Sequence, residues 1–277
     1  MAEIGKTAGL RVVNKLDAGV YLDGGALGEI FMPRSYASGD YRTGDVVEVF
    51  IFPDAEGRIL ATTSRPYAIV GDFALLKVSS LTPVGAFLDW GLKKDLLVPF
   101  SEQKQKMVEG KSYLVYVYLD EKSNRIVASS KLGRFLDKET IEFQEGQRVD
   151  LLIFSRTGIG YTAIINSSRR GMLYKNEIFQ PLKTGQRITG FIKKVRADGK
   201  IDLCLQKPGR EKIDDVADKI IDTLKKSKGF ISVTDKSPPD VIYRLFGASK
   251  KTFKKAMPPL SIKWPVIELV VKNCKKE

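Results

Sequence analysis

The chain has 277 residues, 43% hydrophobic and 29% charged, which is the composition of a folded water-soluble protein of roughly two to four domains. It contains no histidine, which excludes serine–histidine and cysteine–histidine catalysis and most catalytic zinc sites. Its two cysteines, Cys204 and Cys274, are too few for a disulfide framework or a four-thiolate zinc site. No apolar stretch approaches the ~20 residues that span a bilayer, and the first residues do not resemble a secretory signal. We therefore expect a protein of the reducing cytoplasm, without catalysis, metal or other cofactor.

Positive charge is concentrated in the second half of the chain. Lysine and arginine together exceed aspartate and glutamate by 46 to 33, a net charge of +13. Residues 1–73 carry a net charge of −3 and residues 74–145 of +1, whereas residues 146–210 carry +9 and residues 211–277 carry +6. This asymmetry favours a polyanionic partner, because each neutralised phosphate releases counterions. A charged surface that only keeps the protein soluble is the alternative, and no basic segment pairs with an apolar stripe that would contact a membrane.

One pattern occurs three times along the chain. In each copy two glycines stand 25 residues apart: Gly19 and Gly44, Gly85 and Gly110, and Gly160 and Gly185. Short segments of alternating polarity, rich in β-branched and aromatic residues, surround these glycines and are typical of half-buried strands. Five short strands in ~60 residues suit a small barrel, because closing the sheet removes its exposed edges. The repeat therefore predicts three tandem barrels at residues 1–70, 71–140 and 141–210.

The remaining residues, 211–277, change to a helical period. A first helix of about four turns is predicted by apolar residues that recur on one face: Ile213, Val216, Ala217, Ile220, Ile221 and Leu224. Ser237, followed by two prolines, predicts the N-cap of a second helix. That helix should end at Gly247, a residue that stops helices readily.

A third helix is predicted from its N-cap Ser249 to Met257, with Pro258 and Pro259 ending it. Its lysines form one cationic face, opposite Phe253 and Met257: Lys250, Lys251, Lys254 and Lys255. Two helices joined by a tight glycine turn form a helix-turn-helix, which favours phosphate contact over a merely solvated lysine face. No arginine, asparagine or glutamine on this helix could read a base edge, so sequence-specific recognition is not expected.

The threefold pattern resembles the S1 domain, an RNA-binding form of the oligonucleotide-binding (OB) barrel. The resemblance rests on Gly19-Val20-Tyr21-Leu22-Asp23 and on Gly85-Ala86-Phe87-Leu88-Asp89 in the first two copies. The third copy departs from it, because the aromatic residue in Gly160-Tyr161-Thr162-Ala163 is shifted by one position. On the next strand our alignment places Val98 and Tyr174 where the first copy has Phe31. The resemblance implies a mostly β chain of three five-stranded OB-fold (S1-like) barrels.

S1 domains stack aromatic rings on unpaired bases and contact phosphates with nearby cations. The resemblance implies that RNA is bound by Tyr21, Phe31 and Arg34 in the first copy, by Phe87, Lys93 and Lys94 in the second, and by Arg156, Tyr161, Arg169, Arg170, Tyr174, Lys175, Lys193, Lys194 and Arg196 in the third. The alternative for each aromatic residue is an ordinary core or surface position. The basic cluster of the third copy is better supported, because its 13 basic residues outnumber 4 acidic ones.

Three S1-like barrels followed by a small α-helical, winged-helix-like domain resemble the conserved virulence factor B family. The most particular segments are Ser237-Pro238-Pro239-Asp240-Val241-Ile242-Tyr243 and Gly247-Ala248-Ser249-Lys250-Lys251-Thr252-Phe253-Lys254-Lys255-Ala256. Residues 258–277 depart from the family's β wing and give the domain an atypical tail. The resemblance implies RNA binding and a part in regulating gene expression, without catalysis.

The leading hypothesis is therefore a cytoplasmic, non-enzymatic protein that binds single-stranded RNA and regulates gene expression after transcription. One alternative is a DNA-binding transcriptional regulator that uses the helix-turn-helix. Another is an adaptor that docks onto the ribosome or RNA polymerase through protein contacts.

Overall fold

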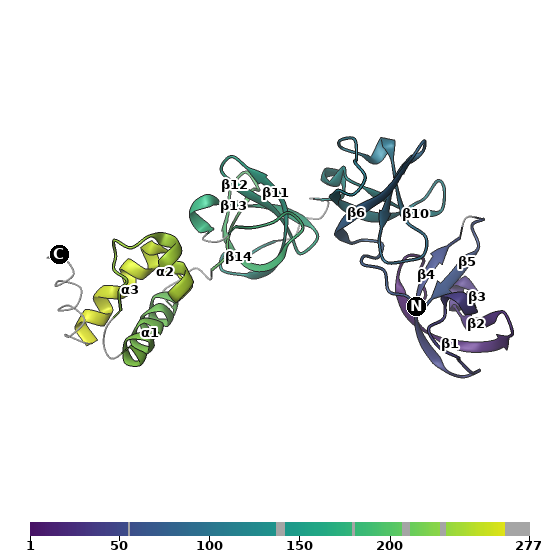
Figure 1. Cartoon of the computed structure of the whole chain (residues 1–277), viewed down its shortest axis with the longest axis horizontal. Helices are drawn as coiled ribbons and strands as arrows, with labels where there is room; N and C mark the ends of the chain where they lie inside the picture. Colours follow the sequence, from purple (N-terminus) through teal and green to yellow (C-terminus); the bar gives the residue numbers. More distant parts are fainter. Residues whose placement is uncertain (55, 137–141, 179–180, 207–210, 228–230, 264–277) are drawn as a thin grey trace. The chain divides into compact units, whose positions relative to one another are not determined.

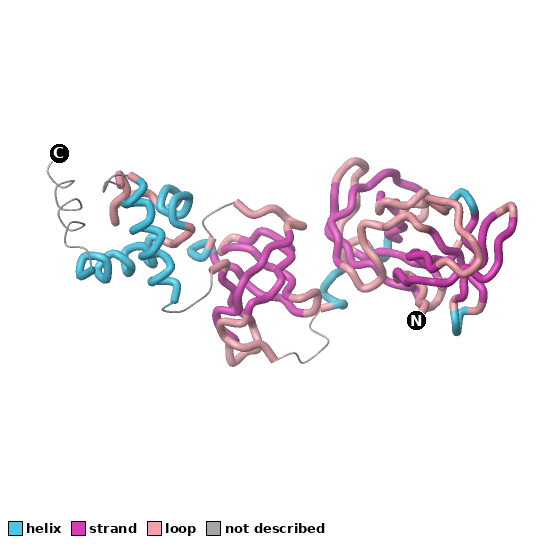
Figure 2. Tube along the Cα trace, turned by 90° about the horizontal axis from the view of Figure 1, so that it is seen from below, coloured by secondary structure: helices cyan, strands magenta, loops and turns pink. Residues whose placement is uncertain are grey.

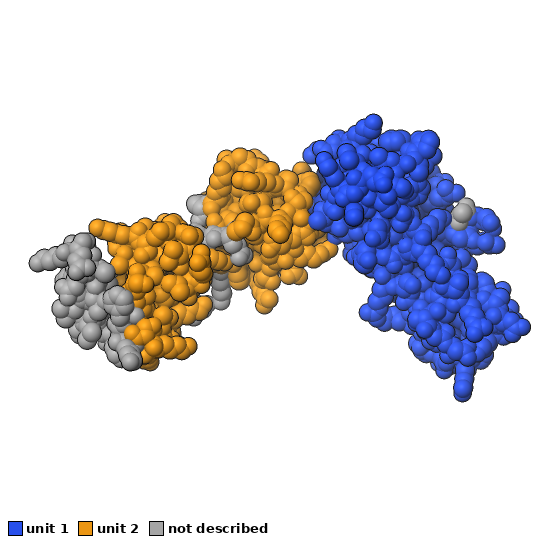
Figure 3. Space-filling model, viewed as in Figure 1, with its two compact units in different colours: residues 1–138 blue, residues 139–277 orange. Residues whose placement is uncertain are grey.

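The computed structural model describes the chain except for residues 55, 137–141, 179–180, 207–210, 228–230 and 264–277 (Figure 1). The chain divides into two compact units, residues 1–138 and 139–277 (Figure 3). Strands build the barrels, and helices build the C-terminal domain (Figure 2). Over the part of the chain that is described, none of the helices combines the length and apolar character needed to cross a membrane.

The first barrel consists of β1 (Thr7–Leu16), β2 (Gly19–Asp23), β3 (Glu29–Pro33), β4 (Val46–Pro53) and β5 (Ile59–Thr62). It closes in the order β1-β2-β3-β5-β4. β2 and β3 are antiparallel, with Gly19 opposite Pro33 and Tyr21 opposite Phe31. Because side chains alternate along a strand, Leu22 is buried in the core while Tyr21 lies on the outside.

The other two barrels repeat this plan. The second consists of β6 (Phe73–Thr82), β7 (Gly85–Asp89), β8 (Leu96–Pro99), β9 (Ser112–Asp120) and β10 (Arg125–Ser129), and the third of β11 (Arg148–Thr157), β12 (Gly160–Ile165), β13 (Arg169–Tyr174), β14 (Arg187–Val195) and β15 (Ile201–Cys204). A short 3-10 helix follows the third strand of each barrel: Arg34–Tyr36, Phe100–Glu102 and Lys175–Glu177. Three closed five-stranded barrels confirm the fold that the repeat predicted.

The glycines of the repeat meet two different backbone requirements. The first glycine opens the second strand, where a Cβ would come within 2.3 Å of a third-strand carbonyl oxygen, at Gly19, Gly85 and Gly160. The second glycine lies in the turn before the fourth strand, where φ is between 77° and 98°, at Gly44, Gly110 and Gly185. Only glycine adopts that left-handed conformation without strain. The 25-residue spacing thus separates two positions that require glycine: the start of the second strand, where the third strand comes close, and the turn before the fourth strand.

The first two barrels are joined by an apolar core. Phe50 on β4 points away from its own barrel, is 1% exposed and packs edge-on against Trp90 of the second barrel, with ring centroids 5.6 Å apart. Phe52, two residues on, is buried in the same cluster. The backbone N–H of Val70 also donates to the carbonyl of Gly5 at 2.9 Å. Large aromatic contacts of this kind dominate packing energies, so the two barrels share part of their stability.

The C-terminal domain consists of α1 (Glu211–Lys226), α2 (Pro239–Phe246) and α3 (Lys250–Lys263). Phe246 of α2 stacks on Phe253 of α3, with centroids 5.2 Å apart, at the centre of its core. Gly247 ends α2 as predicted, with φ at 62° and its N–H donating to the carbonyl of Tyr243 at 2.7 Å. Ser249 also caps α3 as predicted, since its hydroxyl accepts from the Thr252 N–H at 3.1 Å.

Two predictions about these helices are wrong. Pro238, and not Ser237, occupies the N-cap position of α2, and the Ser237 hydroxyl accepts from the Thr234 N–H at 2.9 Å instead. The helical backbone of α3 also continues past Pro258 and Pro259 to Lys263. A proline removes one backbone donor and crowds the preceding turn at a cost of ~3 kcal/mol, which a helix can survive as a kink. The tail predicted to differ from a β wing lies, from residue 264 on, outside the described residues.

We expect Gly85→Ala to destabilise the first unit by about 1–3 kcal/mol, the usual cost of overpacking. The added Cβ would lie 2.3 Å from the carbonyl oxygen of Val98, which belongs to the backbone and cannot rotate away. Gly133→Ala is the matched control, because its Cβ would meet nothing within 4 Å. Urea unfolding of the full chain measures both, and equal midpoints for the two variants would contradict the close-approach argument.

Candidate nucleic-acid interface

The outer face of the first barrel carries a pair of aromatic rings. Tyr21 and Phe31 lie directly opposite each other on β2 and β3, with ring centroids 5.0 Å apart and planes inclined by 39°. Both rings are half-exposed, and the exposed Arg34 follows at the start of the 3-10 helix. This surface offers two rings on which an unpaired base can stack, with a cation beside them.

The second barrel has one ring at the corresponding place. Phe87 lies outward on β7 and is half-exposed, and its partner across the strands is Leu97. The alignment matched Val98 of this barrel to Phe31 of the first. Val98 is fully buried and Leu97 is the residue that corresponds to Phe31, so that alignment is wrong by one residue. A one-residue slip moves a side chain to the other face of a strand. The prolines that end both third strands, Pro33 and Pro99, pair with the repeat glycines and could have given the correct register.

The two lysines predicted on the second barrel have different surroundings. The Lys93 ammonium donates to the carbonyl of Ser35 in the first barrel at 2.6 Å and lies 5.2 Å from the centroid of the Tyr36 ring. Lys93 therefore helps to join the two barrels. Lys94 is exposed, and its backbone carbonyl is held by the indole N–H of Trp90 at 2.6 Å.

The third barrel lacks the aromatic pair. On its β12 and β13, Thr162 and Met172 occupy the outward places that Tyr21 and Phe31 hold in the first barrel. Tyr161 falls on the inward side, as its shift by one position suggested, and packs against the barrel core. Tyr174 pairs with Gly160 at the end of the strand, so its alignment with Phe31 is wrong by two residues.

A different cluster surrounds Tyr174. Its hydroxyl accepts from Nη2 of Arg196 at 2.7 Å, and Nε of Arg196 donates to both oxygens of Asp202 at 2.9 and 3.0 Å. Lys193 forms an ion pair with Glu177 at 2.7 Å. The hydrogen bond to Asp202 raises the pKa of Arg196, and the hydrogen bond to Glu177 raises the pKa of Lys193. Both side chains are therefore fully charged at neutral pH and are oriented by carboxylates.

The remaining predicted cations of the third barrel do not form one site. Lys175 follows Tyr174 directly and is exposed, and Arg156 and Lys194 are exposed on β11 and β14. Arg169 and Arg170 begin β13 while Tyr174 ends it, which separates them from Tyr174 by roughly 13 to 17 Å at the usual strand rise. The structure thus brings together Tyr174, Lys175, Lys193 and Arg196, and it leaves the arginine pair at the opposite end.

The lysines of α3 differ in their surroundings: three are exposed, and one is held by hydrogen bonds. Lys251, Lys254 and Lys255 are exposed, on the side of the helix away from the buried Phe253. Lys250 is only half-exposed, because its ammonium donates to the backbone carbonyls of Lys236 and Ser237 at 3.2 and 3.1 Å. It holds the segment before α2, a structural contact that the pattern of lysines did not reveal.

We expect Lys250→Ala to destabilise the C-terminal domain by about 1 kcal/mol, because hydrogen bonds from a charged group are lost. Lys254→Ala, which removes an exposed lysine of the same helix, should change stability little. Thermal unfolding of the full chain, followed by the far-UV circular dichroism of its helices, compares them. Equal melting temperatures for the two variants would contradict a structural role for Lys250.

Comparison with known proteins identifies two kinds of domain. The S1 domain family matches residues 4–64 and again residues 70–131, and the CvfB-like winged helix domain matches residues 218–261. An uncharacterized protein, YitL of Bacillus subtilis, is 27% identical over 267 residues, which are 91% of this chain and 87% of that protein. Conserved virulence factor B of Staphylococcus aureus (strain MRSA252) is 26% identical over 272 residues, or 92% and 88% of the two chains. A crystal structure of a multidomain protein with nucleic acid binding domains from Streptococcus pneumoniae matches at a TM-score of 0.40, with 21% identity over 94% of this chain and 93% of that chain.

Proposed function

Because the chain belongs to the conserved virulence factor B family, we propose that it is a cytoplasmic protein that binds single-stranded RNA and regulates gene expression after transcription, without catalysis. Its S1 and winged helix domains are nucleic-acid-binding domains, which supports the choice of partner. We propose that residues 1–138 bind RNA mainly by base stacking and that residues 139–277 bind it mainly through phosphate contacts.

The observation that carries this proposal is the pair Tyr21 and Phe31. The two rings stand side by side on an exposed face of the sheet. Bases in a duplex are stacked on one another, so their faces are not available to these rings. Stacking on such rings stabilises a complex by ~1–3 kcal/mol per base and requires no particular sequence, because every base has a π-face. Single-stranded RNA is therefore the ligand that this surface suits best.

Charge supports the second part of the proposal. Residues 146–277 carry a net charge of +15, whereas the stacking pair lies in a segment, residues 1–73, with a net charge of −3. Arg196 and Lys193 are each paired with one carboxylate at a partly exposed position. Such pairs are weak in water, so a phosphate can replace the carboxylate at little cost.

We expect the affinity of the full chain for an unstructured oligouridylate to fall steeply with salt. Each phosphate contacted contributes about −0.7 to the slope of log K against log salt for a single strand. Filter binding between ~50 and ~200 mM salt measures this slope. An affinity that does not change over this range would contradict phosphate-led binding.

Stacking is tested in the same assay. Tyr21→Leu and Phe31→Leu keep an apolar side chain at each site and remove the ring, so each should weaken binding by roughly 5- to 100-fold, the equivalent of one stacked base. Tyr67→Leu is the control, because Tyr67 is 69% exposed and lies between β5 and β6, outside the strands β2 and β3 that carry the pair. Equal losses for all three variants would assign the effect to general destabilisation.

Duplex DNA is the second candidate ligand, because α2, Gly247 and α3 form a helix-turn-helix whose second helix exposes three lysines. The RNA proposal expects single-stranded RNA to displace duplex DNA in competition, with Lys251→Ala combined with Lys254→Ala weakening RNA binding only modestly. A preference for duplex DNA that this double variant abolishes would favour the transcriptional regulator instead. Lys250 is left unchanged in this test because of its structural contacts.

A further inference from the structure

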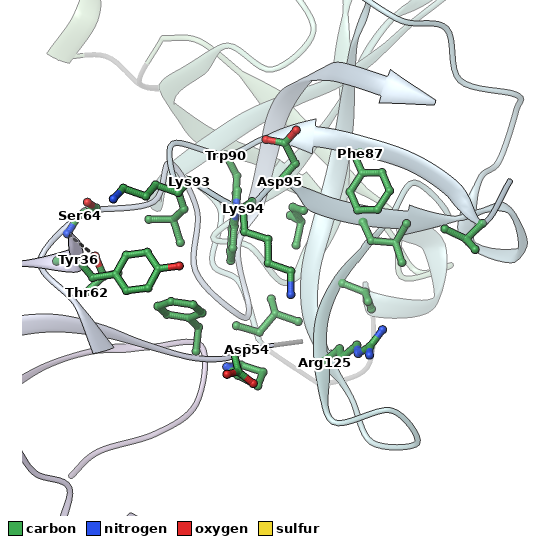
Figure 4. A pocket seen from close by; sticks show the side chains of 18 residues that line it. Tyr36, Asp54, Thr62, Ser64, Phe87, Trp90, Lys93, Lys94, Asp95 and Arg125 are labelled. Atoms are coloured by element: carbon green, nitrogen blue, oxygen red, sulfur yellow. Dashed lines mark hydrogen bonds between the residues drawn. The ribbon is translucent and has the colours of Figure 1, made fainter. Parts of the chain in front are cut away.

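A cavity of about 300 Å³ lies where the first two barrels meet (Figure 4). The first barrel contributes Tyr36 and Phe52 to its lining, and the second contributes Phe87, Trp90 and Lys94. Phe87 is the outward ring of the second barrel, so the cavity is continuous with the face on which that barrel would stack a base. The first barrel thus adds a wall beside the outward ring of the second barrel.

The walls of the cavity are mainly apolar and include four aromatic rings, Tyr36, Phe52, Phe87 and Trp90, two of which are held by contacts at the joint between the barrels. Trp90 is 5% exposed, its ring packs against Phe50, and its indole N–H donates to the Lys94 carbonyl at 2.6 Å. The Tyr36 ring packs edge-on against Phe52, with centroids 5.7 Å apart. Ligand pockets of small molecules begin at about 300 Å³, so the cavity suits one flat group and not a stretch of polymer.

Lys94 supplies an available positive charge. Its side chain extends into the cavity (Figure 4), and within the described residues its ammonium forms no ion pair. Three other charged groups of the lining are engaged: Lys93 with Ser35, Asp54 with Arg58 at 2.7 Å, and Asp95 with the hydroxyl of Ser79 at 2.5 Å. Arg125 also lines the cavity. Aromatic walls with one unpaired ammonium match a planar, anionic ligand.

We propose that this cavity receives one unpaired nucleotide of a bound single-stranded RNA. The base lies between the aromatic walls, with Phe87 on one side, and Lys94 contacts the adjoining phosphate. The proposal rests on the RNA-binding function proposed above, and it adds a site made by two barrels together. Because a walled pocket encloses the edges of a base, this site can distinguish bases, whereas the open face at Tyr21 and Phe31 cannot.

Trp90 makes the site directly observable. The chain has two tryptophans, and Trp264→Phe leaves Trp90 as the single one. We expect the Trp90 emission of this variant to be quenched by an unstructured oligouridylate, with the same half-saturation as the anisotropy of a labelled copy of that RNA. Adding Lys94→Ala should weaken binding by about 3- to 10-fold and reduce the salt slope by about 0.7, the share of one phosphate. Lys106→Ala, which removes an exposed lysine of the same barrel outside the cavity, should leave both unchanged.

The possible results separate the pocket from the function on which it rests. RNA binding seen by anisotropy without any change in Trp90 emission overturns the pocket and leaves the proposed function standing. No RNA binding by anisotropy overturns the proposed function itself. Uridine monophosphate that quenches Trp90 at the same concentration as the oligomer overturns the RNA proposal in favour of a free-nucleotide site. Equal losses for Lys94→Ala and Lys106→Ala overturn the phosphate contact.

Discussion

The contact between the second and third strands of each barrel is the constraint on which the candidate interface depends. A glycine at the start of the second strand lets the third strand approach so closely that no Cβ fits between them. This contact fixes the register, and the register decides which side chains reach the outer face. Tyr21 and Phe31 are neighbours across the strands because Gly19 is opposite Pro33 two residues earlier.

The same scaffold carries three different surfaces. The first barrel presents two rings, the second presents one ring beside a wall made by its neighbour, and the third replaces the pair with threonine and methionine. In the third barrel the tyrosine at the strand end is surrounded by cations that carboxylates orient. Outward aromatic rings and net positive charge are thus concentrated in different parts of the chain.

The barrels and most helix ends could be predicted because their signals are local. Glycine spacing, alternating polarity and capping residues each act within a few positions of the chain. The third-strand alignment failed because β8 has only four residues, Leu96–Pro99, all of them apolar, and pairing across strands decides its face. The role of a lysine is ambiguous in the sequence for a similar reason. Lys93 and Lys250 donate to backbone carbonyls, and no sequence signal distinguishes them from lysines that are exposed to water.

The joint between the first two barrels was also missed, although the sequence contains a trace of it. Val49, Phe50, Ile51, Phe52 and Pro53 are all buried, without the alternation of a strand that has one side in water. A strand that is covered on both faces has a continuous run of apolar residues in its sequence. Such a run in a small barrel indicates that another module packs against its outside.

The shared core of Phe50 and Trp90 has a consequence for how the proposed RNA ligand could bind both modules together. Modules on a flexible tether accept many spacings, and each binding event must then immobilise the tether. Two barrels fused through a core have already lost that freedom during folding, so bivalent engagement costs less conformational entropy. Under the proposed function, the fused pair therefore sets the distance between its two aromatic surfaces and favours single-stranded RNA whose accessible bases are separated by that distance.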